Sequence, residues 1–208
     1  MRPHRKSAAL TLTLLMLMLP ASASGLAGAA PFVPPAPGTY RLETISQAPP
    51  GRVLDSGGRL HPLSRYVRGR VTLLGFIYTY CTDPQACPLA YRTFAELHAR
   101  LARVPTLASQ VRLVSLSFDP VNDTPAMMRA YGGAYLDGPS CVPWHFLTTR
   151  SVAELKPMID GLGQAVAVQR DAAGRPTRLY NHMLKVFLFD RYGRVREIYS
   201  TAYLQPDV

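Results

Sequence analysis

The chain has 208 residues, of which 48% are hydrophobic and 17% charged, a composition typical of one globular domain and not of a disordered chain. Lysine and arginine number 23 against 13 acidic residues, for a net charge of +10, but the basic residues are scattered, which argues against nucleic-acid binding. A basic surface suits an acidic protein partner or an anionic membrane surface.

The first residues, Met1–Ala23, have the features of a secretory signal. Basic residues at the start precede the apolar stretch Ala8–Leu19, and small residues close the segment. The apolar stretch is shorter than the roughly 20 residues that cross a bilayer. We therefore expect a cleaved signal and export to the periplasm, with membrane anchoring if the leader is retained.

A proline-rich linker and one folded domain follow the predicted signal. Ser24–Thr39 is rich in proline and small residues and is predicted to be a tether, and Tyr40–Val208 is predicted to be the domain. An exported domain can form disulfides, but its three cysteines are too few, and odd in number, for a disulfide framework. A chemical role is therefore a better interpretation of the close pair Cys81 and Cys87 than a structural disulfide framework.

The domain alternates predicted strands and helices. Residues 71–80 are a continuous apolar and β-branched run, which predicts a buried strand, and residues 87–104 have the spacing of an amphipathic helix with Pro88 in its first turn. The later predicted elements are strand 111–118, helix 124–131, strand 144–148, helix 151–162 and a hairpin of strands 183–190 and 195–200. This order predicts an α/β fold with a central sheet covered on both faces.

Cys81 directly follows the first long predicted strand, and Cys87 opens the next helix. Sites in α/β sheets form at the carboxyl ends of strands, so both sulfurs are expected there, and the helix dipole is expected to favour a thiolate at Cys87. Asp83 and Pro84 supply a turn that can bring the sulfurs within disulfide or metal-ligand distance. An inert disulfide is the alternative, but closing so short a loop stabilises least, which favours redox or metal chemistry.

Five segments carry a resemblance to a known family. They are Gly75–Cys81, Cys87-Pro88, Asp119–Pro125, Trp144–Thr148 and Asn181-His182. Together they resemble the SCO/SenC copper-binding proteins, over most of Tyr40–Ser200. The resemblance implies a thioredoxin-like fold, with a central mixed sheet, flanking helices and a C-terminal β-hairpin, and a role in assembling the Cu-A centre of cytochrome c oxidase. Two features depart from the family: five residues separate the cysteines instead of three, and the family continues into a closing helix.

Carried over by position, Cys81 and Cys87 would be thiolate ligands of copper and His182 its imidazole ligand. The chemistry agrees, because thiolates suit Cu(I) and an added imidazole allows Cu(II) as well. Asp119 follows a predicted strand. One interpretation is functional: the Asp119 carboxylate orients a ligand or contacts a partner at this edge of the sheet. The other is structural: Asp119 is a turn residue before Pro120. Both interpretations stay open.

Other polar residues are given structural roles. His98 is expected to be solvated on its helix, and His145 to be structural in a strand. Cys141 is expected to be a buried, small apolar residue. Asp123 and Thr124 are expected to cap the following helix.

The sequence thus predicts an exported copper chaperone that delivers copper to a respiratory enzyme, such as a cytochrome c oxidase subunit. The alternative is a thiol-disulfide oxidoreductase with Cys81 and Cys87 as its redox-active pair, which draws electrons from a thiol reductant and reduces the cysteines of a copper-protein partner. Such enzymes normally carry Cys-x-x-Cys and a proline where this chain has His182. A peroxidase is disfavoured because Tyr78 stands where its threonine is needed.

Overall fold

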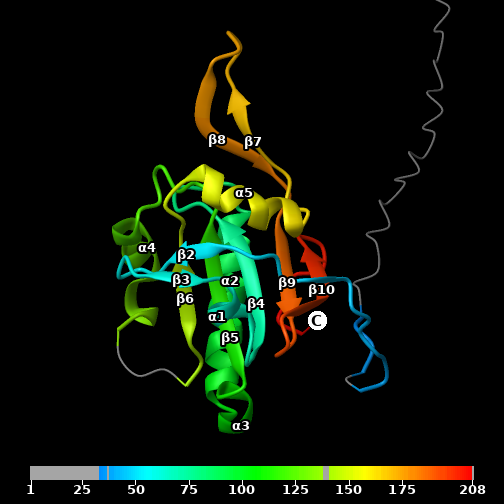
Figure 1. The fold of residues 1–208 in the computed structure, drawn as a ribbon. Helices are drawn as coiled ribbons and strands as arrows, with labels where there is room; N and C mark the ends of the chain where they lie inside the picture. The colour runs from blue at the N-terminus through cyan, green and yellow to red at the C-terminus, as the bar shows by residue number, and fades with distance from the viewer. Residues whose placement is uncertain (1–32, 37, 138–140, 208) are drawn as a thin grey trace, which may run out of the picture. The chain divides into compact units, whose positions relative to one another are not determined.

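A six-stranded mixed sheet forms the centre of the described part of the chain (Figure 1). The computed structural model describes residues 33–36, 38–137 and 141–207, so the predicted signal and much of the predicted linker lie outside the described residues. Across the sheet the strands are β1 (Ser46–Gln47), β10 (Arg194–Ser200), β9 (Lys185–Phe189), β4 (Val71–Ile77), β5 (Val111–Ser117) and β6 (Trp144–Leu147). β4, β5 and β6 are parallel, whereas β9 is antiparallel to β4. The predicted α/β class with a central mixed sheet is confirmed.

Helices and two small hairpins complete the fold. The helices are α1 (Ser64–Val67), α2 (Cys87–Ala102), α3 (Pro105–Ala108), α4 (Pro125–Gly132) and α5 (Val152–Gly161), with a 3-10 turn η1 (Gly133–Tyr135). The hairpins pair β2 (Arg52–Leu54) with β3 (Leu60–Pro62), and β7 (Val166–Arg170) with β8 (Pro176–His182). The predicted long elements and the C-terminal hairpin β9–β10 are confirmed with small shifts at their ends, whereas the β7–β8 hairpin was not predicted.

The core lies between the sheet and its helices. Side chains of β4, β5, β6 and β9 supply most of its large apolar groups, and α2 adds Phe94, which is 1% exposed. Each fully buried side chain of this size contributes about 1.5–3 kcal/mol relative to an exposed one. Thr124 caps the start of α4, as predicted: its hydroxyl accepts a hydrogen bond from the Met127 N–H, and Pro125 is the first residue of the helix.

The parallel strands point toward the end of the sheet where α5 and the β7–β8 hairpin lie (Figure 1). The residues that follow β4 therefore emerge beneath this hairpin. Cys81 comes four residues after the end of β4 at Ile77, and His182 is the last residue of β8. The fold thus brings the predicted ligands to one end of the molecule's central sheet.

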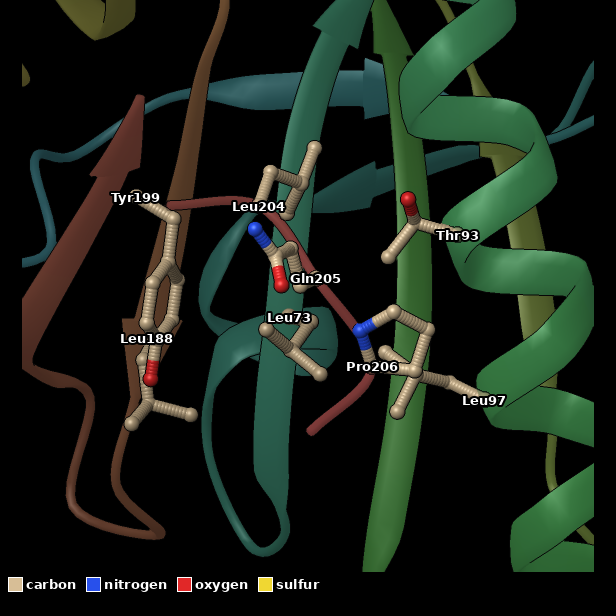
Figure 2. Close-up of a pocket in the computed structure, with 8 residues that line it drawn as sticks. All are labelled: Leu73, Thr93, Leu97, Leu188, Tyr199, Leu204, Gln205 and Pro206. Atoms are coloured by element: carbon tan, nitrogen blue, oxygen red, sulfur yellow. The ribbon is translucent and has the colours of Figure 1, made fainter. Parts of the chain in front are cut away.

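Residues after β10 fold back over the other elements. Figure 2 shows Pro206 between Leu73 of β4 and Leu97 of α2, and Leu204 on the side of Leu73 toward Tyr199; these residues line a cavity of about 200 Å³. Leu204 is 5% exposed and belongs to the core. No helix among the described residues combines the length and apolar content that a membrane crossing requires.

Candidate metal centre

The structure brings Cys81, Cys87 and His182 together. The two sulfurs and a ring nitrogen of the histidine all lie within 4.8 Å of one another. Within the described ranges, this is the one group of three or more Cys, His, Asp or Glu side chains that could hold a metal ion. Cys87 is buried, while Cys81 and His182 are partly exposed, so the cluster opens to solvent on one side.

The five-residue loop between the cysteines folds back as the sequence predicted. The Cys81 N–H donates to the Tyr78 carbonyl at 3.2 Å, and the Ala86 N–H donates to the Asp83 carbonyl at 3.1 Å. The Asp83 carboxylate also accepts from the Gln85 N–H at 2.9 Å, which is a turn closed by a side chain. This turn places the first residue of α2 beside Cys81.

Cys81 is the acidic thiol of the pair. Hydrogen bonds from the Cys87 thiol, His182, the Cys87 N–H and the Tyr78 hydroxyl outweigh partial burial and lower the pKa of Cys81 to about 4. The hydrogen bond to Cys81, together with burial, raises the pKa of Cys87. The prediction of a thiolate at Cys87 was therefore wrong, because the Cys87 thiol donates its hydrogen bond to the Cys81 sulfur and burial disfavours the charged form of Cys87.

Aromatic rings hold the imidazole in place. The Phe118 ring lies 4.9 Å from the His182 ring, and the Tyr78 ring meets it edge-on at 5.8 Å. The Tyr180 ring packs against the Tyr78 ring at 5.3 Å and against the Phe118 ring at 5.2 Å. Sequence reasoning missed these contacts, because they join residues that lie far apart in the sequence.

Asp119 lies just after the end of β5 and is 1% exposed. Its carboxylate accepts a short hydrogen bond from the Tyr80 hydroxyl and another from the Asn122 side-chain amide at 2.7 Å. The Asn122 N–H also donates to it at 3.3 Å, as a turn residue requires. Asp119 thus reaches the site through Tyr80, the residue before Cys81.

Asp123 ties the ends of two strands together. Its carboxylate accepts hydrogen bonds from the Thr79 N–H at 3.0 Å, from the Thr79 hydroxyl at 2.6 Å and from the Ser117 hydroxyl. The side chain is fully buried, and burial raises its pKa. Asp123 was predicted to be a helix cap, but Thr124 alone caps α4, and Asp123 instead fixes the segment that leads into Cys81.

Two other sequence predictions also need correction. Cys141 is exposed, not buried, because it lies in the loop before β6 and not in a strand. His98 is partly buried and packs against Tyr135, with ring centroids 5.2 Å apart, so it is not a solvated residue. His145 lies in β6 and packs on Tyr66 at 5.0 Å, in agreement with the structural role expected of it.

A family model described as SCO1/SenC matches residues 57–208 of the chain. No curated protein sequence matches it significantly. The matched residues include the cysteine loop, the Asp119 and Asp123 segment and His182.

Solved structures show the same fold. Copper-bound ScoI of Bradyrhizobium japonicum is 23% identical, with a TM-score of 0.61 over 78% of this chain and 94% of that one. Copper-bound yeast Sco1 is 18% identical, with a TM-score of 0.59 over 76% and 83%. BsSco, described as having a disulfide switch and as a member of the Sco family of cytochrome c oxidase assembly proteins, is 23% identical, with a TM-score of 0.56 over 78% and 89%. The fold is therefore the thioredoxin-like fold of these structures.

Proposed function

This chain belongs to the SCO1/SenC family, and we propose that it is an exported copper chaperone that binds one copper ion through Cys81, Cys87 and His182. The observation that carries the proposal is the approach of the three ligand atoms to within 4.8 Å of one another. Solved proteins of the same fold, from Bradyrhizobium japonicum and yeast, are described with copper bound. The recipient we propose is a respiratory copper enzyme, such as a cytochrome c oxidase subunit, in keeping with the description of BsSco.

The donor set suits copper in both oxidation states. Thiolate sulfur is a soft ligand that binds Cu(I), and imidazole nitrogen allows Cu(II) to bind at the same site. Hydrogen bonding already stabilises the Cys81 thiolate, whereas the Cys87 thiol retains its proton. Metal binding therefore releases a proton from Cys87, because a thiol must be deprotonated to act as a ligand.

The exposure of the ligands sets an order for copper transfer. Cys81 and His182 are partly exposed, whereas Cys87 is buried. His182 lines a cavity of about 290 Å³ that also borders Asp83 and Asn181. A thiolate of the acceptor can approach from this side and replace His182 or Cys81 first. The Cu–S bond to Cys87 then breaks last, and the copper ion is never released into water.

Metal analysis of the purified, reduced protein tests this function. We expect about one copper ion per chain, and loss of tight binding when Cys81→Ala or Cys87→Ala removes a thiolate. Cys141→Ser is the matched control, because it removes an exposed thiol outside the cluster and is expected to leave the copper content unchanged. Retention of tightly bound copper by the Cys81→Ala, Cys87→Ala double variant would overturn the proposal.

A thiol-disulfide oxidoreductase is the second candidate, favoured by one acidic thiol beside one protonated thiol. In this reaction the Cys81 thiolate attacks a disulfide of the partner and forms a mixed disulfide. Cys87 then attacks Cys81, so the partner leaves with two thiols and the chain holds a Cys81–Cys87 disulfide, which a thiol reductant must reduce. Exchange with a disulfide substrate, together with no copper binding in any state, would favour this function over the chaperone.

A further inference from the structure

Another pocket lies at the end of the sheet opposite to the cysteines. It has a volume of about 280 Å³ and is lined by Arg65, Tyr66, Arg70, Arg112, Pro143 and His145. Neither the SCO1/SenC match nor the copper proposal gives these residues a role.

The sheet itself places these residues together. Arg70 immediately precedes β4, and Arg112 is the second residue of β5, where it pairs with Thr72. His145 is the second residue of β6 and pairs with Val114, two residues along β5 from Arg112. Residues two apart on a strand point to the same face, so Arg112 and His145 project toward the same side, where α1 supplies Tyr66.

No carboxylate in the described part of the chain forms an ion pair with the arginines of this pocket. Among the described residues, none of Arg65, Arg70 and Arg112 forms an ion pair; the nearby Asp55 is paired with Arg59 and His61. Burial, and then the charges of Arg70 and Arg65, lower the pKa of Arg112. Like charges therefore repel one another across the pocket, and a bound anion would relieve this repulsion.

Arg112 is held in the pocket wall, and its neighbours there carry hydrogen-bond donors. One amino group of Arg112 donates to the Arg65 carbonyl at 2.8 Å, which holds the guanidinium in the pocket wall. Tyr66 is buried, and its ring meets His145 edge-on at 5.0 Å. Burial, and then the three arginines, lower the pKa of His145 to about 4, so its neutral ring offers one N–H at pH 7. Guanidinium groups with additional N–H or O–H donors are the usual partners of phosphate oxygens.

We propose that this pocket binds a phosphate group, held by Arg65, Arg70 and Arg112. The same chemistry is presented by free inorganic phosphate and by the headgroup of an anionic phospholipid. The site is independent of the copper proposal, because it shares no residue with the cysteine cluster. If the source is a lipid, the cysteine end of the sheet is turned away from the bound headgroup.

Titration of the full chain with inorganic phosphate, followed by calorimetry and by the side-chain NMR signals of its histidines, tests the site. We expect saturable binding that shifts the His145 signals and leaves those of His98 on α2 unchanged. Arg70→Ala is expected to weaken phosphate binding at least about tenfold, since it removes one charge-assisted hydrogen-bond donor. Arg103→Ala, which removes the same charge from an exposed position at the end of α2, is the matched control and should change affinity less than about twofold.

A second arm distinguishes the two sources of phosphate. The protein is sedimented with phosphatidylglycerol vesicles and with phosphatidylcholine vesicles at constant ionic strength. Binding to the anionic vesicles that Arg70→Ala reduces and Arg103→Ala does not would identify a lipid headgroup, whereas binding of inorganic phosphate alone would identify a free anion. Arg65→Ala is the second variant in the pocket and provides an independent readout. Arg112 is not substituted, because its guanidinium donates hydrogen bonds to two backbone carbonyls and their loss would destabilise the fold. Absence of binding in both arms, or equal effects of Arg70→Ala and Arg103→Ala, would overturn the proposal.

Discussion

At the scale of single residues, the acidity of Cys81 depends on hydrogen bonds that a substitution can remove one at a time. Tyr78→Phe removes the hydroxyl that hydrogen-bonds to the Cys81 sulfur but keeps the ring beside His182. Because a hydrogen bond to a charged group contributes about 1.5 kcal/mol, we expect the Cys81 pKa to rise by about one unit. The pH dependence of alkylation in a Cys141→Ser background measures this shift. Tyr192→Phe, exposed at a remote turn, is the control, and an unchanged pKa in Tyr78→Phe would contradict the expectation.

His182→Ala separates the two copper states. Cu(I) is satisfied by two thiolates, whereas Cu(II) gains more from imidazole nitrogen. We therefore expect the substitution to lower the Cu(II) affinity about tenfold more than the Cu(I) affinity. Titration of the reduced protein with each copper state measures the difference, and His98→Ala serves as a control at a histidine outside the cluster. Equal losses for both states would show that His182 is structural.

The ligand cluster could be predicted from sequence, but the residues around it could not. Cys81 and Cys87 stand out through their position after a strand and at a helix start, and His182 through the family resemblance. The thiolate was predicted at Cys87 and lies at Cys81, because the acidity depends on the direction of the thiol–thiol hydrogen bond and on the burial of Cys87, which the sequence does not show. The link from Asp123 to Thr79 spans 44 residues of sequence, and no local pattern reveals such a contact.

At the scale of elements, three hairpins share one turn, Asp-x-x-Gly-Arg. It occurs at Asp55–Arg59, Asp171–Arg175 and Asp190–Arg194. In each, the aspartate accepts hydrogen bonds from the N–H groups two and four residues later and from the arginine side chain four residues later. The glycines of the three turns, Gly58, Gly174 and Gly193, have φ angles of 79°, 77° and 80° respectively, a left-handed conformation that favours glycine. The motif therefore marks the turns of β2–β3, β7–β8 and β9–β10.

This motif could have predicted the β7–β8 hairpin, which hydrophobic patterning missed. Most residues of β7 and β8 are exposed or only partly buried, so neither strand has a clear apolar face. Alternation of apolar and polar residues predicts a strand when one face of the strand is buried. A hairpin that projects beyond the sheet has little buried surface on either face, so its sequence shows little alternation. The strands β4 and β5, by contrast, are buried along most of their length and were predicted from their apolar runs.

The turn in the β9–β10 hairpin should contribute to stability in a way that depends on pH. Burial alone would raise the pKa of Asp190, but hydrogen bonds from Arg194, Arg196 and Tyr192 lower it to about 2. Because the folded pKa lies below the unfolded value, this stabilisation is present above about pH 4 and is lost as the pH falls toward 2. We expect Asp190→Asn to cost about 1 kcal/mol at pH 7, a value reduced for partial solvent screening.

Denaturant unfolding of Asp190→Asn and the unsubstituted chain between pH 7 and pH 2 measures this effect. The difference in unfolding free energy should shrink below pH 4 and be mostly lost near pH 2. Asp171→Asn, the same substitution in the turn of the exposed β7–β8 hairpin, is the control and should have a smaller effect, because that hairpin packs less against the core. A difference that persists unchanged at pH 2 would show that the charge of Asp190 is not responsible.

At the scale of the whole domain, β4 separates the two sites. Arg70 precedes its first residue and Cys81 comes four residues after its last, and its seven residues span roughly 20 Å at about 3.3 Å each. The strand is paired on both sides, with β5 and with β9. A strand held in this way is a rigid spacer, so nothing in its pairing offers a second arrangement that could link the sites.

We therefore expect copper and phosphate to bind independently. Coupling between two ligands is reciprocal, and it requires each of them to favour one of two states of the protein. Loading the cysteine cluster with Cu(I) should change the phosphate affinity by less than about twofold, and Arg70→Ala should leave the Cu(I) affinity unchanged within the same limit. Calorimetric titration with phosphate of the copper-free and Cu(I)-loaded chain measures the first effect, and competition for Cu(I) with a chelator measures the second. A mutual change of about tenfold would require a movement of the sheet, and would make the basic pocket a regulator of copper transfer.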